Sequence, residues 1–294
     1  MIKTSIQKYL NQLLSKRLGK KIPTVEISSV GGGSINGTFR VRAGSENFFL
    51  KVNSSSRFPG LFEKEKSGLE FIASKKCIRV PIVVACDQVD QDQILLLEWI
   101  EGGARNDAFW KRFGSQLAEL HQVTTAECGF SEDNYMGALP QKNSLMRSWT
   151  EFFVRCRLEP QLQSALANHL VESRHLDAFE KLYPRLENIF GREGFALLHG
   201  DLWSGNFVCD QFSTPVLIDP AVYFGHRSMD LGMTTLFGGF DRMFYESYNY
   251  HFPFPENYDE QWEICNLYPL LIHLNLFGPG YLGQIDRILK KFTP

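Results

Sequence analysis

The sequence lacks the features that mark membrane-spanning, secreted and nucleic-acid-binding proteins. None of its apolar runs approaches the roughly 18 residues that a membrane-spanning helix needs. Apolar residues in segment 1–17 recur at helical spacing among lysines, whereas a signal peptide has a continuous apolar core. The net charge is only -2, so we expect no nucleic-acid partner and no association with membranes.

Cysteine is scarce and unpaired in the sequence. The six cysteines are scattered without a C-x-x-C pair, at positions 77, 86, 128, 156, 209 and 265. This pattern predicts reduced and mostly buried thiols in a cytoplasmic protein. Internal repeats and low-complexity segments are absent as well. The 294 residues are enough for a large core and for two lobes or domains.

Two familiar nucleotide-binding motifs are also missing. The glycine cluster Gly31-Gly32-Gly33-Ser34 has neither the G-x-G-x-x-G pattern nor a Walker lysine, which argues against Rossmann and P-loop sites. It lies between two predicted strands, Thr24–Val30 and Ile35–Arg42. A glycine-rich turn there lets backbone N–H groups face phosphate oxygens. Most glycine clusters are simply turns, so this cluster alone does not establish a phosphate site.

What the sequence does contain is a pair of strand ends that carry polar side chains. The short apolar runs 195–198 and 216–218 predict buried strands, because they are brief and bounded by turn residues. The first leads into His-Gly-Asp-Leu-Trp-Ser-Gly-Asn over 199–206, and the second leads into Asp219. Rigid strands beneath exposed loops are a common setting for a functional site.

The spacing within these two clusters predicts phosphoryl transfer. Asp201 precedes Asn206 by five positions and Asp219 by eighteen. Transfer from ATP needs one carboxylate to orient the attacking hydroxyl, and an amide oxygen and a second carboxylate to hold Mg²⁺. The same D-x-x-x-x-N order followed by a metal-binding Asp marks the kinase catalytic loop. The alternative is a surface Asx-turn beside an unrelated strand end.

A lysine and a glutamate form the second candidate pair. Lys51 lies in the short apolar strand 47–52, where a charge is costly to bury unless it is paired. Glu65 interrupts the apolar face of a predicted helix over 61–74, whereas the neighbouring glutamates lie off that face. We therefore predict that Glu65 pairs with Lys51. An edge-strand lysine in solvent, or a shifted helix face, are the alternatives.

The chain changes character near residue 100. Strands are predicted over 80–85 and 93–97, and the second leads into a glycine-containing connector, so we place a lobe boundary between residues 1–100 and 101–294. Helical spacing dominates beyond it, over segments 110–123, 145–170, 175–190, 227–237, 262–276 and 281–292. His121 lies in the first of these and is expected to be a core histidine, because no second metal ligand lies at a useful spacing.

Taken together, these motifs resemble the fructosamine (ketosamine) kinases, within the protein-kinase-like and aminoglycoside phosphotransferase superfamily. The resemblance runs from about residue 22 to the C-terminus. Its most specific motif is H-G-D-L-W-S-G-N at 199–206, with tryptophan after the leucine. The other motifs are N-Y-M-G at 134–137 with P-Q at 140–141, W-T-E-F-F at 149–153, L-F-G-G-F at 236–240 and H-L-N-L-F-G at 273–278.

The resemblance implies an α+β, two-lobed protein-kinase-like fold. Its small N-lobe would have an antiparallel sheet plus a helix, and its large C-lobe would be mainly helical. The implied activity is ATP-dependent phosphorylation of the 3-hydroxyl of a ketoamine, fructosamine or ribulosamine, free or on a protein lysine. Because the phosphorylated products of the family are labile, the activity would serve deglycation. ATP and Mg²⁺ are the implied cofactors.

The resemblance also implies roles for individual residues. Asp201 would accept the proton, Asn206 and Asp219 would hold Mg²⁺, and the glycine loop with Lys51 and Glu65 would position phosphates. Glu98, Trp99 and Ile100 would form the adenine-binding hinge, and His199 and Trp203 would contact the substrate. A structural wedge is an equal alternative for Trp203. Ser34 stands where many relatives carry cysteine, so no thiol switch is expected there. Ser228 stands where relatives commonly have an acidic residue, which leaves a substrate-amine contact at that position open.

Two alternatives stay open at this stage. One is another small-molecule kinase of the same superfamily, acting on an aminoglycoside, choline or a related alcohol. The other is a catalytically inactive kinase fold that serves as a binding module, although all five expected catalytic residues are present. The sequence leaves open the physiological acceptor, the preference between fructosamine and ribulosamine, the nucleotide donor, the acceptor-binding residues and the oligomeric state.

Overall fold

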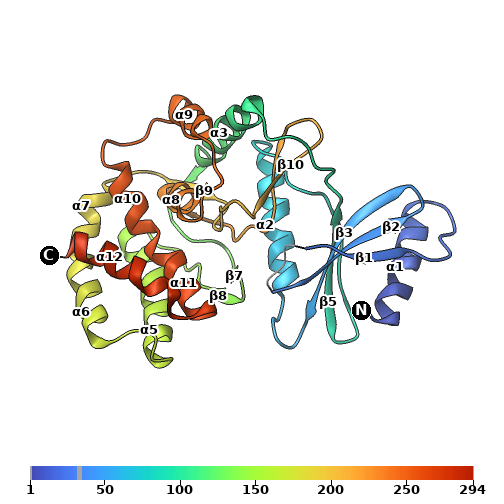
Figure 1. The fold of residues 1–294 in the computed structure, drawn as a ribbon, viewed down its shortest axis with the longest axis horizontal. Helices are drawn as coiled ribbons and strands as arrows, with labels where there is room; N and C mark the ends of the chain where they lie inside the picture. Colours follow the sequence, from blue (N-terminus) through green and yellow to red (C-terminus); the bar gives the residue numbers. More distant parts are fainter. Residues whose placement is uncertain (1, 32–34, 294) are drawn as a thin grey trace.

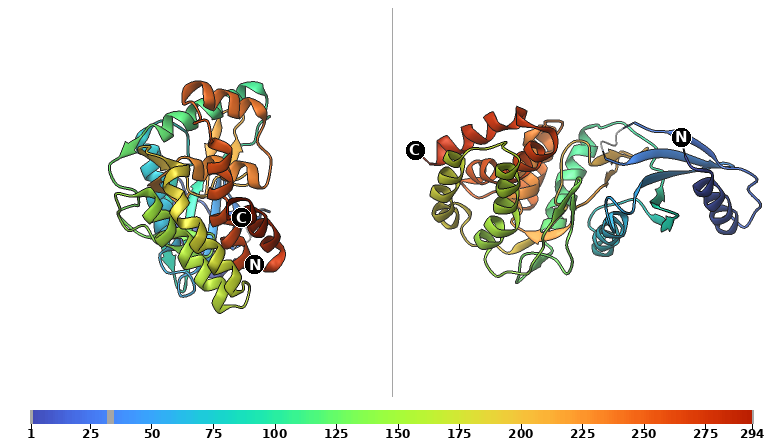
Figure 2. Two further views of the ribbon diagram at one scale, coloured as in Figure 1. Left: turned by 90° about the vertical axis from the view of Figure 1, so that its left-hand side faces the viewer. Right: turned by 90° about the horizontal axis from the view of Figure 1, so that it is seen from below.

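The computed structural model describes residues 2–31 and 35–293, which form two lobes (Figure 1). The first lobe is an antiparallel sheet with helices, and the second is mainly helical. Helix α1 (Thr4–Arg17) and helix α12 (Leu282–Phe292) lie at opposite ends of the molecule (Figure 2). This arrangement confirms the predicted α+β, two-lobed architecture. Within the described residues, none of the helices combines the length and the apolar character needed to cross a membrane.

The N-lobe sheet has a helix on each face. Its strands lie in the order β1-β2-β3-β5-β4. Helix α1 packs its apolar stripe, including Leu10 and Leu14, on one face. Helix α2 packs Phe62 and Leu69 on the other face, which also contacts the C-lobe. The bounds are β1 Glu26–Ser29, β2 Gly37–Ala43, β3 Glu46–Ser54, α2 Leu61–Lys75, β4 Val83–Val89 and β5 Asp92–Glu98.

Strand β3 shows how the sheet delivers a charge to the cleft. Successive side chains of a strand point to opposite faces. Phe48 and Leu50 accordingly pack in the cluster beneath α1, while Lys51 points to the face covered by α2. Strand β5 ends at Glu98, and the chain then pairs with the C-lobe through a bridge between Gly102 and Asp210. We propose residue 100 as the boundary between the lobes.

The C-lobe surrounds a small sheet of order β12-β9-β6 and the hairpins β7–β8 and β10–β11. The predicted residues Asp201 and Asn206 lie on the loop between β9 and β10, and Asp219 lies between β11 and β12. The strand bounds are β6 Thr124–Thr125, β7 Asn134–Met136, β8 Leu139–Gln141, β9 Phe195–Leu198, β10 Phe207–Cys209, β11 Pro215–Leu217 and β12 Tyr223–Gly225. The helices are α3 Asp107–His121, α4 Trp149–Phe152, α5 Glu159–Ala167, α6 Ser173–Leu182, α7 Leu186–Phe190, α8 Ser228–Leu236, α9 Arg242–His251, α10 Tyr258–Cys265 and α11 Leu267–Phe277.

The structure corrects one expectation about the C-lobe helices and adds a helix that the sequence analysis does not predict. The continuous helix expected over 145–170 begins only at Trp149, where the Ser148 side chain caps it by accepting from the Glu151 N–H. A π-helical segment, Phe153–Leu158, then interrupts it and places Arg157 completely inside the lobe. Helix α9 was not predicted, because its aromatic and polar residues give no simple apolar stripe in the sequence.

The crossing of α3 and α9 depends on one glycine. A Cβ at Gly114 of α3 would overlap the carbonyl oxygen of Phe244 and lie 2.8 Å from the Tyr248 nitrogen, both in α9. Glycine is unfavourable in a helix interior by about 1 kcal/mol relative to alanine. The residue therefore costs local helix stability and allows the two helices to approach closely. This approach brings His121 of α3 to Tyr248 of α9.

We expect Gly114→Ala to lower the free energy of unfolding by about 1–3 kcal/mol, because the added methyl overpacks the α3–α9 contact. Gly283→Ala is the matched control. Gly283 lies in α12 with nothing within 4 Å of an added Cβ, so this change should be neutral or stabilising. Urea unfolding followed by circular dichroism measures both. Equal stability changes in the two variants would contradict this account of the crossing.

Candidate active site

Five of the predicted residues line one pocket between the lobes. Lys51 and Glu65 reach it from the N-lobe, and Asp201, Asn206 and Asp219 reach it from the C-lobe loops. They come from segments up to 168 positions apart (51 to 219). The fold thus brings the predicted Lys51–Glu65 pair together with the three residues of the predicted kinase motif. Their chemical roles remain predictions at this point.

Lys51 is the buried cation of this pocket. Its side chain is 2% exposed, and its Nζ lies 2.7 Å from Glu65 Oε1 and 2.7 Å from Asp219 Oδ1. The contact with Glu65, in place of its neighbours on α2, confirms the pairing predicted from the helix face. Helix α2, strand β3 and the segment after β11 therefore meet at one ammonium group.

The charges of this cluster depend on one another. Burial lowers the pKa of Lys51, but the carboxylates of Asp219 and Glu65 outweigh burial and raise it to about 12. The lysine is therefore a cation at neutral pH. Burial raises the pKa of Glu65; the Lys51 ammonium opposes the rise and Asp219 adds to it, giving about 7. Two carboxylates share a single ammonium, which is why the cluster keeps an excess of negative charge.

Asp201 and Asn206 form the core of the catalytic loop. The Asn206 Nδ2 group donates to both the backbone oxygen and the Oδ2 of Asp201, each at 2.8 Å. Burial raises the pKa of Asp201 to about 7; the Asn206 hydrogen bond opposes the rise, and the carboxylates of Asp219 and Asp230 add to it. A carboxylate with a raised pKa is a better proton acceptor than an ordinary aspartate.

The backbone of this loop is held by a side chain that sequence reasoning missed. Asp230 of α8 is 1% exposed, and its two oxygens accept from the N–H groups of His199 at 2.7 Å and Gly200 at 2.9 Å. Gly200 has φ +84°, and a Cβ there would overlap the carbonyl oxygen of Ala221. Glycine is therefore required between the histidine and the aspartate.

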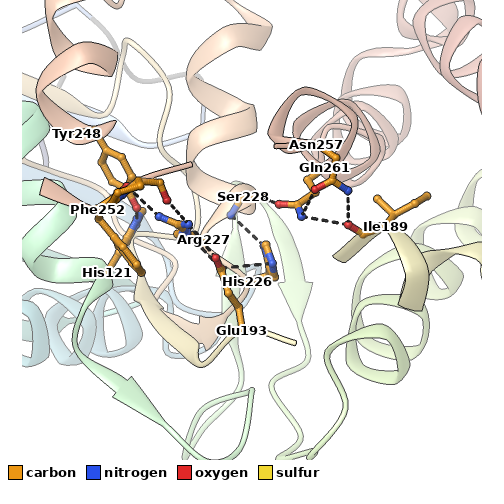
Figure 3. A network of polar contacts seen from close by, with 11 residues as sticks. His121, Ile189, Glu193, His226, Arg227, Ser228, Tyr248, Phe252, Asn257 and Gln261 are labelled. Carbon is orange, nitrogen blue, oxygen red and sulfur yellow. Dashed lines mark hydrogen bonds and ion pairs between the residues drawn. The ribbon is translucent and has the colours of Figure 1, made fainter. Parts of the chain in front are cut away.

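Asp230 is itself fixed by a buried hydrogen-bond chain. His121 Nε2 lies 3.2 Å from its Oδ2, and His121 Nδ1 lies 2.8 Å from the Tyr248 hydroxyl. Figure 3 shows His121 and Tyr248 beside a second buried group in which Arg227 binds Glu193. His121 is completely buried, which confirms the predicted core histidine. The one signal for Asp230 in the sequence is that it is the only charged residue of helix α8.

His199 does not lie where a substrate contact was expected. Its side chain is completely buried, its Nε2 lies 2.8 Å from the Ile218 carbonyl oxygen, and its Nδ1 accepts from the Asp201 N–H at 3.2 Å. Burial lowers the pKa of His199 below its ordinary value, so the ring is neutral. We correct the expectation: both ring nitrogens join the loop to the strand end before Asp219, which leaves neither for a substrate.

The oxygen donors of the site fit Mg²⁺. The Nδ2 of Asn206 is turned toward Asp201, which leaves its Oδ1 as an acceptor, and Asp219 uses Oδ1 for Lys51, which leaves its Oδ2. Both residues line the same pocket. Within the described residues, no three His, Cys, Asp or Glu side chains gather into a metal cluster. Mg²⁺ is typically held by one or two protein oxygens together with water and phosphate, and the donor set matches that requirement.

The wall of the pocket on the C-lobe side is aromatic. Trp203, His273 and Phe277 line it, and Phe237 lies between the first two with ring centroids 6.1 Å from Trp203 and 4.7 Å from His273. Trp203 is 37% exposed, and its ring covers Gly205 so closely that a side chain there would overlap it. Trp203 therefore lines the pocket, and its roles as a substrate contact and as a structural wedge both stay predictions.

The proposed hinge and glycine loop are only partly placed. Gly31 is exposed, and Gly32, Gly33 and Ser34 lie outside the described residues. Glu98 forms an ion pair with Arg79, and its N–H donates to the Ile82 carbonyl oxygen. Trp99 stacks under the Arg40 guanidinium. Glu98, Trp99 and Ile100 are not among the residues that line the pocket, so adenine binding at 98–100 stays a prediction.

Ser228 is placed away from the pocket. It is 2% exposed at the start of α8, and its hydroxyl donates to Gln261 Oε1 at 2.9 Å (Figure 3). This position lies inside the helical part of the C-lobe. The structure therefore gives Ser228 a packing role and does not bring it to the residues that line the pocket.

Comparison with known proteins identifies the family. A family model described as fructosamine kinase matches residues 6–293. A protein of Enterococcus faecium named "Probable ketoamine kinase" is 37% identical over 289 residues, covering 98% of this chain and 99% of that protein. An Arabidopsis thaliana protein named "Protein-ribulosamine 3-kinase, chloroplastic" is 35% identical, covering 93% of this chain and 84% of that protein.

Solved structures agree with this result. A crystal structure described as a candidate fructosamine-3-kinase from Thermobifida fusca superimposes with a TM-score of 0.85 at 29% identity, covering 96% of this chain and 98% of that one. The aminoglycoside phosphotransferase APH(4)-Ia, solved with AMP-PNP and hygromycin B, superimposes with a TM-score of 0.68 at 15% identity, which shows the shared fold alone. The predicted protein-kinase-like fold is confirmed. The chain belongs to the fructosamine kinase family and is a phosphotransferase that acts on a hydroxyl group.

Proposed function

We propose that this protein transfers the γ-phosphoryl group of ATP to the 3-hydroxyl of a ketoamine, with Mg²⁺ as cofactor. The observation that carries the proposal is the convergence of Asp201, Asn206 and Asp219 with the Lys51–Glu65 pair in one pocket. Membership of the fructosamine kinase family supports the acceptor class. The acceptor is a fructosamine or ribulosamine, free or on a protein lysine.

Asp201 orients the acceptor hydroxyl in this proposal. Asn206 binds its Oδ2, which leaves Oδ1 to accept the hydroxyl proton. Phosphoryl transfer depends mainly on positioning and on charge stabilisation. A fixed carboxylate serves the first need, because it aligns the attacking oxygen and takes its proton late in the reaction.

Lys51 supplies the second need, the stabilisation of charge. Its ammonium is buried and fixed by ion pairs, and a preorganised charge shielded from solvent acts more strongly on a phosphate than it would in water. Asn206 and Asp219 are the residues that would hold Mg²⁺, and the bound ion would offset the negative charge of the phosphates.

The aromatic wall suits a sugar acceptor. Trp203 lies two positions after Asp201, and its partly exposed ring faces the same pocket. An indole face packs against the C–H face of a sugar while its hydroxyl groups stay free to hydrogen-bond. We propose that Trp203 holds the acceptor sugar beside Asp201, with His273 and Phe277 completing the wall.

The compartment is also a proposal. All six cysteines are free thiols, and five of them are buried, at positions 77, 128, 156, 209 and 265. Burial raises the pKa of several of these thiols, including those of Cys128 and Cys265, which keeps them protonated and unreactive at neutral pH. These properties suit a reducing compartment, and we propose the cytoplasm.

We expect Asp201→Asn to lower kcat at least 100-fold while the affinity for AMP-PNP changes by less than about threefold, because the amide keeps the shape and loses the proton acceptor. Phosphate transfer to ribulose-lysine and fructose-lysine, with the site of phosphorylation read by NMR, measures kcat. Calorimetry measures the affinity for AMP-PNP. The matched control is Asp177→Asn, an exposed aspartate of α6.

Two outcomes of this experiment would contradict parts of the proposal. An Asp201→Asn enzyme with the activity of the wild type would remove Asp201 from catalysis. If the wild type binds AMP-PNP and phosphorylates neither adduct, the fold assignment stands and the ketoamine acceptor is wrong. A panel of aminoglycosides, choline and related alcohols would then identify the acceptor.

Activity should fall in acid. Burial raises the pKa of Asp201 to about 7, so its carboxylate binds a proton as the pH drops through that value and no longer accepts one from the substrate. We expect kcat/KM for ATP to decline about tenfold per pH unit below the apparent pKa. A positive ion near a carboxylate lowers the pKa of that carboxylate. The acidic decline of kcat, which reports the enzyme with Mg²⁺ and substrates bound, should therefore lie at lower pH than the decline of kcat/KM.

Glu65 titrates in the same range, so a variant must separate the two groups. Its pKa is also raised to about 7, and its protonation would weaken the contact with Lys51. In Glu65→Gln the acidic limb should persist, because Asp201 is intact. Loss of the limb in Glu65→Gln would assign it to Glu65 and contradict the role given to Asp201.

We expect Trp203→Ala to raise KM for the ketoamine about tenfold and to leave KM for ATP unchanged, because the variant loses the apolar surface under the sugar. Trp203→Phe should retain most of the affinity. Steady-state kinetics with each substrate varied in turn measures both constants. A parallel rise in both KM values would indicate that Trp203 supports the whole pocket and does not contact the sugar.

A further inference from the structure

A hairpin of the C-lobe reaches the segment that carries Asp219. Strands β7 and β8 pair with Asn134 opposite Gln141. Both side chains are buried, and Gln141 Nε2 donates to Asn134 Oδ1 at 2.8 Å. The hairpin lines the pocket through Asn134, Tyr135, Met136 and Gly137. The mechanism proposed above does not use this buried amide pair.

The two amides hold consecutive carbonyl groups. Asn134 Nδ2 donates to the Val222 carbonyl oxygen at 2.9 Å, and Gln141 Nε2 donates to the Ala221 carbonyl oxygen at 3.2 Å. Tyr268 donates to Gln141 Oε1 at 2.8 Å and so fixes which end of the amide faces Ala221. Only a side chain with both a donor and an acceptor can satisfy these partners, which accounts for asparagine and glutamine here.

The same segment is confined on its other sides. The Ala221 N–H donates to the His199 carbonyl oxygen at 2.8 Å, which joins it to the catalytic loop. Helix α2 approaches it at Gly68, where an added Cβ would lie 3.1 Å from Val222 Cγ2. The backbone after Asp219 is therefore fixed between the catalytic loop, α2 and the hairpin.

Asp219 needs this confinement because its own backbone is strained. It has φ +56°, in the left-handed region that residues other than glycine rarely adopt. Such a conformation persists only where the surrounding structure over-determines it. Gln141 binds the carbonyl group of Ala221 and Asn134 binds that of Val222. These groups lie two and three positions after Asp219, close enough to set its conformation.

We propose that the Asn134–Gln141 pair is a positioning element that keeps the Asp219 carboxylate aligned for a divalent cation. The inference rests on the proposed function only for the identity of the cation site. It goes beyond the proposed function because it assigns a positioning role to two residues outside the catalytic set. Partners that orient a metal ligand typically change metal affinity 10–100-fold when they are removed.

The test measures cation binding directly. We expect Gln141→Met, which keeps the side-chain length and removes the amide, to weaken Mn²⁺ binding in the presence of AMP-PNP at least tenfold, as followed by electron paramagnetic resonance. Asn134→Leu, which keeps the side-chain shape and removes the amide that donates to Val222, should weaken it in the same direction. KM for the ketoamine should stay unchanged in both variants, because the Trp203 wall is intact.

Gln261→Met is the matched control. Gln261 is also buried, and its amide donates to the Ile189 carbonyl oxygen at 3.0 Å within the network of Figure 3. It does not line the pocket, so Mn²⁺ affinity should equal that of the wild type. An equal loss in Gln261→Met, or wild-type affinity in folded Gln141→Met, would overturn the proposal.

Failure of the proposed function would look different. A wild-type protein that binds Mn²⁺ and AMP-PNP but phosphorylates no ketoamine would remove the acceptor assignment and leave the comparison of cation affinities intact. If Gln141→Met does not fold, as judged by circular dichroism, Asn134→Leu decides: wild-type Mn²⁺ affinity in that variant would overturn the inference, and a loss would support it.

Discussion

The buried ammonium of Lys51 is the constraint on which the two lobes depend. A charge that is 2% exposed must be paired, because an isolated ion in a protein interior is very costly. Its partners, Glu65 and Asp219, come from α2 and from the segment after β11, at 2.7 Å each. The requirement to pair one charge therefore fixes the sheet, the helix and a C-lobe loop relative to one another.

Contacts away from the charge hold α2 in the same place. The Tyr135 hydroxyl donates to the Pro59 carbonyl oxygen just before α2, and Lys64 of α2 forms an ion pair with Glu132. Phe71 of α2 packs edge-on against Phe130, with ring centroids 5.1 Å apart. The pairing of Lys51 with Glu65 is thus a consequence of how the lobes pack as well as a cause of it.

The sequence predicted the parts of the site that are encoded locally. The spacing of Asp201, Asn206 and Asp219 follows from short strands and loops, and the choice of Glu65 follows from one helix face. Asp230 could not be found this way, because its partners are backbone N–H groups about 30 positions earlier in the chain. The expectation for His199 failed for a similar reason: residue type suggests a substrate contact, and only tertiary burial shows that both ring nitrogens are used.

The charges of the pocket support the cation site that we propose. Asp201, Asp219 and Glu65 bring three carboxylates to the pocket, and Lys51 pairs with the last two of them. Burial raises the pKa of Asp201 and the carboxylates of Asp219 and Asp230 raise it further, which is the mark of an excess of negative charge. A divalent cation placed between Asn206 and Asp219 would relieve that excess. The same ion would keep Asp201 ionised at neutral pH, so cation binding and the readiness of the proton acceptor are coupled through one local field.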